Sequence, residues 1–301
     1  MRVYYFTNRA QEGEKDGLPQ FGAKPGRLTA GVAEVDIRQG FDITTRDGIT
    51  IRSMKPIKSA KAIPGRSESE SKNVLIFVHG FYVAFTESIQ RVAQIVHAYD
   101  YSGTVVVYSW PSLCQFSKAA YLADRKALDA SADAFRQFLK DMTERFGGAR
   151  MQILAHSLAC RLVGTTVATT VSANGNRTPL QLRNVVFVAP DVDVARFRDE
   201  FSAPLSCVVR RLTIYHSRSD KLLWFAEIYN DGRRRLGSVG PDGTKNIETV
   251  DFTELGGLFA AHNFYREHPA VVLDVRGVLS GAIPYCRRQL LTKNRPSLNS
   301  N

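Results

Sequence analysis

The 301-residue chain has few of the features that mark membrane, secreted or metal-binding proteins. No apolar run reaches the roughly 18 residues that a membrane-spanning helix needs. The apolar part of the segment Met1–Arg9 is too short for a signal-peptide core, and no small-residue cleavage site follows it. The four cysteines show no Cys-x-x-Cys spacing, so we expect neither a zinc site nor a disulfide framework. These absences lead us to expect a cytoplasmic protein without a metal or an organic cofactor.

The composition is that of a folded protein with an excess of positive charge. Hydrophobic residues make up 44% of the chain and charged residues 23%, close to the averages for soluble globular proteins. Lys and Arg number 40 against 29 Asp and Glu, which gives a net charge of +11. Basic residues gather at 210–211, 233–235 and 287–295, without a recognisable nucleic-acid-binding motif. An anionic surface is therefore a possible partner, nucleic acid is not expected, and the oligomeric state stays open.

Apolar runs rich in β-branched residues predict a series of buried strands. They lie at 74–78, 104–108, 151–154, 185–188, 212–215 and 248–252. Continuous rather than alternating apolarity is typical of strands that are covered on both faces. Helical periodicity lies between them, for example from Leu128 to Phe146, where Gly147 and Gly148 stop it. This alternation predicts an α/β fold with a mostly parallel central sheet and helices on both faces.

Ser157 is the candidate nucleophile. It lies in the segment Ala155–Ala159, between a predicted strand and a helical pattern that runs to about Val171. A serine on such a turn points outward from the end of the sheet, where it can attack a substrate. The usual pattern has Gly at the two positions that Ala155 and Ala159 occupy here. From the turn alone, capping of the following helix is an equally good interpretation of Ser157.

A serine nucleophile needs a base, and the chain offers only six histidines. His262 suits this role because it follows the last predicted strand on a Gly-containing segment. The acid that orients the base should lie between the serine and the histidine in the chain. Asp220, after the strand at 212–215, is the favoured acid and Asp193 is the reserve. Capping of a turn is the alternative role for either aspartate.

A turn with a different candidate role follows the strand at 74–78. It contains His79, Gly80 and Phe81. Glycine lets the backbone turn sharply, so that the next amide could face a developing oxyanion. A simple turn without a catalytic role fits the same residues equally well.

Six segments, in order over about residues 3–280, resemble a mostly bacterial family of α/β hydrolases long catalogued only as a domain of unknown function. They are Tyr4–Arg9, Val78–Phe81, Tyr108–Ser112, Ala155–Ala159, Ala189–Asp193 and His262–Tyr265. The resemblance implies an α/β-hydrolase fold and a serine-hydrolase site. In that site Ser157 is the nucleophile, His262 the general base and Asp220 the orienting acid. The backbone N–H groups of Phe81 and Leu158 are the implied oxyanion donors.

The expected function is hydrolysis of carboxylic esters through an acyl-enzyme on Ser157, of esterase or lipase type, with a small-molecule or lipid ester as substrate. Tyr82, Trp110 and His156 are possible pocket residues. A buried aromatic that covers the end of the sheet is an equally good interpretation of Trp110. The alternative function is that of a catalytically inactive binding or scaffold protein, which the two alanines beside the serine keep open.

A triad cannot be assembled from residues that do not share a core, so the spread of candidate residues predicts one domain over residues 1–283. Within it, residues 1–72 supply N-terminal strands, including 31–37 and 48–54, and a solvated linker over 58–72. Residues 73–283 form the catalytic core. Residues 284–301 are a basic tail that we expect to be flexible.

Overall fold

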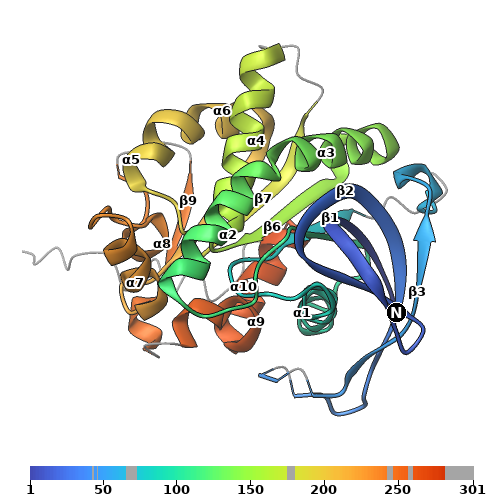
Figure 1. The fold of residues 1–301 in the computed structure, drawn as a ribbon. Coiled ribbons are helices and arrows are strands. Elements are labelled where there is room, and N and C mark those ends of the chain that lie inside the picture. The colour runs from blue at the N-terminus through green and yellow to red at the C-terminus, as the bar shows by residue number, and fades with distance from the viewer. Residues whose placement is uncertain are drawn as a thin grey trace, which may run out of the picture.

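The structure is a computed structural model that describes residues 1–42, 44–45, 47–65, 73–174, 180–242, 247–256 and 260–281 (Figure 1). The expected tail at 284–301 and residues 66–72 of the expected linker lie outside these residues. The strands are β1 (Arg2–Lys15), β2 (Leu18–Ile37), β3 (Ile49–Ile57), β4 (Val74–Val78), β5 (Thr104–Ser109), β6 (Met151–His156), β7 (Leu182–Val188), β8 (Val209–His216) and β9 (Glu248–Asp251). The α-helices are α1 (Phe85–Ala98), α2 (Lys118–Ala130), α3 (Ala132–Phe146), α4 (Ala159–Asn174), α5 (Val194–Arg196), α6 (Ser202–Val208), α7 (Lys221–Tyr229), α8 (Leu236–Val239), α9 (Phe264–Glu267) and α10 (Pro269–Ser280). Short 3-10 or π turns are η1 (Ala60–Ala62), η2 (Gly148–Arg150), η4 (Phe197–Phe201), η5 (Thr253–Leu255) and η6 (Ala260–Asn263).

One sheet contains all nine strands, in the order β3-β2-β1-β5-β4-β6-β7-β8-β9. Only β2 runs antiparallel to its neighbours β1 and β3, while every other neighbouring pair is parallel. The prediction of a mostly parallel sheet is confirmed. This sheet, with the layers of helices described next, is the α/β-hydrolase fold.

Helices cover both faces of the sheet (Figure 1). Helices α2, α3, α4 and α6 pack on one face, and α1, α9 and α10 pack on the other. Strand β4 shows why its sequence is apolar throughout: Ile76 faces the first layer, and Leu75 and Phe77 face the second. All five residues of β4 are buried, as expected of a strand with no solvent-facing side.

The parallel strands bring their following loops to one edge of the sheet. β4 ends before His79, β6 before Ser157 and β8 before Ser217. Because these strands run in the same direction, residues that follow them meet beyond their carboxyl ends, where α/β proteins bind ligands.

The N-terminal strands are longer than the sequence suggested. β1 and β2 have 14 and 20 residues, and they pair as far as Lys15 and Leu18. Proline and glycine do not end these strands because the ladder shifts register around them, for instance where Pro25 lies opposite Arg9. The expected linker also differs, because Ile63 after η1 is buried rather than solvated.

The helical pattern from residue 128 to 146 forms two helices rather than one. The break is at Ser131, whose hydroxyl donates to the Ala127 carbonyl at 2.7 Å and accepts from Asn8 Nδ2 at 2.8 Å. A serine that binds the main chain in this way competes with the helix ladder. The spacing of apolar residues is the same on both sides of the break, so the pattern carried no sign of it.

Candidate active site

Ser157 lies on a sharp turn between β6 and α4. Its φ is +55°, a left-handed conformation that non-glycine residues adopt only when their surroundings enforce it. The Ser157 N–H donates to the Val188 carbonyl at 3.0 Å, and the Ser157 carbonyl accepts from the Asp191 N–H at 3.2 Å. Ala155 and Ala159 are fully buried on either side, so the turn forms with alanine at both positions.

Asp220 holds the ring of His262. The Asp220 Oδ2 atom lies 2.7 Å from His262 Nδ1, and both side chains are buried. A carboxylate accepts hydrogen bonds, so Nδ1 carries the proton and Nε2 keeps its lone pair. The other oxygen, Oδ1, accepts from the N–H groups of Leu222 and Leu223 and caps α7. Asp220 therefore fills both of the roles considered for it, capping a helix and orienting a histidine.

Ser157 and His262 line the same cavity, which has a volume of about 180 Å³. Neither Ser157 Oγ nor His262 Nε2 makes a hydrogen bond to any residue that the structure describes. Catalytic hydrogen bonds are often absent or long before substrate binds, so this arrangement is compatible with proton transfer between the two atoms. Both atoms are free to meet a substrate.

His156 anchors the segment that carries His262. Its Nε2 atom donates to the His262 carbonyl at 2.9 Å, and its ring packs on the His262 and Tyr265 rings at 4.6 and 4.7 Å between centroids. Burial, with the nearby His262 as the next cause, holds the pKa of His156 well below its ordinary value. A neutral His156 in the cavity wall thus fixes the backbone of η6 beneath the candidate base.

Gly80 lies directly against the serine turn. A Cβ atom at this position would stand 3.0 Å from both the His156 carbonyl oxygen and Ser157 Cβ, tighter than most real Cβ contacts. Glycine therefore lets the backbone of this turn lie close to the nucleophile without displacing it. The N–H groups of Phe81 and Leu158 have no acceptor among the described residues.

The direction of the Phe81 N–H is fixed by His79. His79 Nδ1 lies 2.9 Å from the Gly80 carbonyl oxygen, which can only accept, so Nδ1 is the donor. The peptide bond between Gly80 and Phe81 is trans, and in a trans peptide the C=O and the N–H point in opposite directions. Binding the Gly80 oxygen therefore turns the Phe81 N–H away from His79.

Arg9 completes a buried hydrogen-bond chain that ends at this turn. Its Nε donates to Ser109 Oγ at 3.0 Å, and Ser109 Oγ lies 3.2 Å from His79 Nε2. Since Nδ1 holds the ring proton, Ser109 must donate to Nε2. Nη1 of Arg9 donates to the carbonyls of Gly22 and Ser112, and Nη2 donates to the carbonyl of Val83. Burial lowers the pKa of Arg9 to about 10, which leaves it charged at neutral pH.

A comparison with known protein families identifies the group to which this site belongs. The model of the family described as alpha/beta hydrolase of unknown function (DUF900) matches residues 59–279. The chain belongs to this family. No curated protein gives a match to the chain.

Several solved structures match the chain at low identity. A predicted CIB-like hydrolase from Thermoplasma acidophilum is 14% identical, with 84% of this chain and 99% of that chain covered and a TM-score of 0.39. A fungal esterase from Rhizomucor miehei is 12% identical, with 98% and 86% covered and a TM-score of 0.44. A hyperthermophilic esterase from the archaeon Pyrobaculum calidifontis is 11% identical, with 84% and 81% covered and a TM-score of 0.41.

Two expected site residues of this α/β hydrolase lie elsewhere. Trp110 does not line the cavity: it is fully buried, stacks on His79 at 5.0 Å and donates from Nε1 to the His79 carbonyl. It covers the end of the sheet, because its indole N–H finds a partner only beneath the turn. Asp193 caps α5 through the Arg196 N–H and faces Arg235, so it does not serve His262. Tyr82, in contrast, lines the mouth of the cavity.

The sequence did not reveal the other residues that form the wall of the cavity. Asp191 and Tyr121 meet there, with the Tyr121 hydroxyl donating to Asp191 Oδ2 at 2.7 Å. Burial, helped by the carboxylate, raises the pKa of Tyr121, so the phenol keeps its proton. Helix α7 supplies the apolar part of the wall through Leu222, Phe225 and Tyr229. The apolar run at 222–226, just after Asp220 and Lys221, was the one available sequence signal for this wall.

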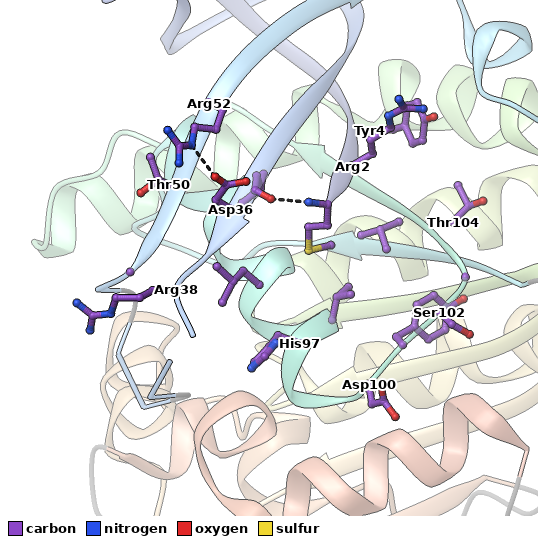
Figure 2. A pocket seen from close by; sticks show the side chains of 18 of the residues that line it. Arg2, Tyr4, Asp36, Arg38, Thr50, Arg52, His97, Asp100, Ser102 and Thr104 are labelled. Atoms are coloured by element: carbon purple, nitrogen blue, oxygen red, sulfur yellow. Dashed lines mark hydrogen bonds and ion pairs between the residues drawn. The ribbon is translucent and has the colours of Figure 1, made fainter. Parts of the chain in front are cut away.

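A larger groove, of about 1240 Å³, shares no lining residue with this cavity, and Figure 2 shows its side chains. It is lined by the start of β1, the end of β2 and the start of β5, at the amino ends of the parallel strands. Its charged side chains include an Asp36–Arg52 pair at 2.6 Å. Its position at the opposite edge of the sheet from Ser157 separates it from the candidate site.

The described residues contain no group of three His, Cys, Asp or Glu side chains placed to hold a metal ion. None of the described helices is long and apolar enough to cross a membrane.

Proposed function

We propose that the protein is a serine hydrolase that cleaves carboxylic esters through an acyl-enzyme on Ser157. The observation that carries this proposal is the pairing of His262 with Asp220. That pairing leaves the basic nitrogen of His262 free in the cavity that also contains Ser157. A serine hydroxyl is a weak nucleophile until such a base accepts its proton.

In the proposed reaction, Ser157 Oγ attacks the ester carbonyl carbon while His262 Nε2 takes the hydroxyl proton. The carbonyl oxygen becomes an oxyanion that accepts hydrogen bonds from the N–H groups of Phe81 and Leu158. Collapse of this intermediate expels the alcohol, which leaves with the proton from His262. Water, deprotonated by His262, then attacks the acyl-enzyme and releases the acid, and the proton returns to Ser157.

The cavity favours small acyl groups. Its volume of about 180 Å³ is close to that of a cavity that accommodates a benzene ring. Its walls are mainly aromatic and aliphatic side chains, among them Phe81, Phe225 and Tyr229. We expect the highest kcat/KM for p-nitrophenyl esters with acyl chains of a few carbons, and a decline for long chains.

A fluorophosphonate probe tests the nucleophile directly. Wild-type protein should be labelled, Ser157→Ala should not, and Ser280→Ala, which changes an exposed serine of α10, should be labelled like the wild type. Absence of labelling in folded wild-type protein would favour the binding or scaffold function instead. Equal labelling of Ser157→Ala would assign the nucleophile to another residue.

A further inference from the structure

The basic clusters noted in the sequence do not line the cavity. Arg211 pairs with Glu248 at 2.8 Å. Arg235 is buried and lies 3.5 Å from both Asp191 and Asp193. Arg210, Arg233 and Arg234 are exposed, and the cluster at 287–295 is outside the described residues. Any partner that docks at the cavity therefore meets other side chains.

Helix α7 has an apolar outer face. Its inner side chains line the cavity or the core, whereas Trp224 and Ile228 point to solvent and are 49% and 50% exposed. A surface helix normally presents polar residues to water. An outward face with tryptophan and isoleucine is therefore expected to be covered by something other than water.

A second exposed apolar segment contributes directly to the cavity lining. Phe116 is 66% exposed and Tyr82 is 46% exposed, with their rings 6.0 Å apart, and both line the cavity. Leu113, in the same loop as Phe116, is also exposed. We refer to Tyr82, Leu113, Phe116, Trp224 and Ile228 as the apolar rim. Of the seven large hydrophobic side chains that are exposed in the described residues, these five lie on segments that carry cavity-lining residues, and Tyr82 and Phe116 line the cavity themselves.

Lysines border the apolar rim. Lys221 lies over the Trp224 ring at 5.7 Å, and Lys118 lies over the Tyr229 ring at 5.6 Å. Both are exposed. Aromatic side chains with neighbouring lysines are typical of surfaces that rest on a lipid headgroup layer. There the rings enter the boundary and the ammonium groups meet lipid phosphates.

We propose that the apolar rim docks on an anionic lipid surface, with the mouth of the cavity facing the lipid. The two lysines beside the apolar rim favour an anionic layer over a second copy of this chain, whose net charge is also positive. The consequence that the substrate is an ester delivered from the lipid rests on the proposed function. Docking itself does not require Ser157.

Binding to vesicles tests the docking. The full chain is sedimented with vesicles of equal parts phosphatidylglycerol and phosphatidylcholine. Trp224→Gln/Ile228→Gln should lower the partition coefficient at least about tenfold, because two apolar side chains no longer leave water. The matched control is Leu273→Gln, which changes an exposed leucine of α10 away from the mouth and should change partition less than about twofold.

The lysines are tested in the same assay. Lys118→Gln/Lys221→Gln should weaken binding about fivefold per lysine at low salt, and the difference should shrink as salt rises. Lys61→Gln/Lys140→Gln removes the same charge from exposed positions elsewhere and should have little effect. An equal loss in both pairs would mean that overall charge, rather than this face, attracts the vesicles.

The outcomes separate the two proposals. Failure of wild-type protein to bind the vesicles, or unchanged binding by Trp224→Gln/Ile228→Gln, overturns the docking. A dimer that this variant converts to monomer, in a protein that ignores vesicles, identifies a second copy as the occupant and overturns it too. Vesicle binding without fluorophosphonate labelling would leave the docking intact and remove the ester hydrolase.

Discussion

Replacement of Ser109 by alanine would test whether the buried hydrogen-bond chain orients an oxyanion donor. The substitution removes the hydroxyl that donates to His79 Nε2 and accepts from Arg9 Nε. Without that donor, His79 Nε2 has no partner, and the ring keeps one hydrogen bond, from Nδ1 to the Gly80 carbonyl. The ring is then free to shift, and the Phe81 N–H is held less firmly in its direction.

The expected effect follows from the contacts that are lost. Two buried polar atoms, one on His79 and one on Arg9, lose a partner, which should cost about 1 to 3 kcal/mol each in stability. Complete loss of one oxyanion donor lowers kcat by about 100- to 1000-fold. Since the peptide is only freed and not removed, we expect kcat to fall at least about tenfold with KM nearly unchanged. A soluble p-nitrophenyl ester and urea unfolding measure the two effects.

Thr7→Val is the matched control. The Thr7 hydroxyl is buried, donates to the Ser109 carbonyl at 2.6 Å and accepts from the Arg9 N–H, but it does not contact His79. It should lower stability by a similar amount and leave kcat alone. If Ser109→Ala lowers stability while kcat stays within twofold of the wild type, the chain is structural and does not orient the Phe81 amide.

Three further predictions concern the serine turn, the acid and the buried histidines. Gly80→Ala should lower kcat and cost about 1 to 3 kcal/mol in urea unfolding, because its Cβ would push the turn that carries Ser157 out of place; a fully active variant would contradict this. Asp220→Asn should lower kcat by about 10⁴-fold and Asp193→Asn should not, and the reverse ranking would exchange their roles. Burial lowers the pKa of His156 below 6.5, so the unfolded state binds more protons and stability falls as pH drops below 6.5, by about 1.4 kcal/mol per pH unit for this proton. When the free energy of unfolding is measured in urea from pH 7 to 5.5, His156→Gln should show a smaller loss of stability per pH unit than the wild type. His97→Gln, at an exposed position, should show the same loss as the wild type. An equal loss in all three proteins would show that His156 does not cause the pH dependence.

The positions of Ser157, Asp220 and His262 could be proposed from sequence for a physical reason. Each follows a strand of a parallel sheet, and parallel strands deliver their following residues to one edge. The choice between Asp220 and Asp193 could not be made with the same certainty. Both cap a helix, and only the packing of η6 beside α7 decides which carboxylate reaches the histidine.

Other features depend on tertiary contacts that no local pattern encodes. The break at Ser131 depends on Asn8, which is 123 residues away. The burial of Trp110 depends on a single carbonyl beneath the turn. From its sequence position near the start of the chain, Arg9 would be expected on the surface. In the structure it donates to carbonyls of three separate segments. A buried cation of this kind is visible only once its acceptors are in place.

The place of β1 in the sheet has a consequence for how the protein folds. β1 pairs with β2 on one side, but its other edge pairs with β5, where Tyr4 lies opposite Val106. About 100 residues separate β1 from β5, so at a synthesis rate of about 5 to 20 residues per second the free edge of β1 stays unpaired for about 5 to 20 s. An apolar strand edge left open for so long is prone to pair with other chains. We therefore expect the yield of soluble protein during expression to depend on chaperones that shield the nascent ribbon.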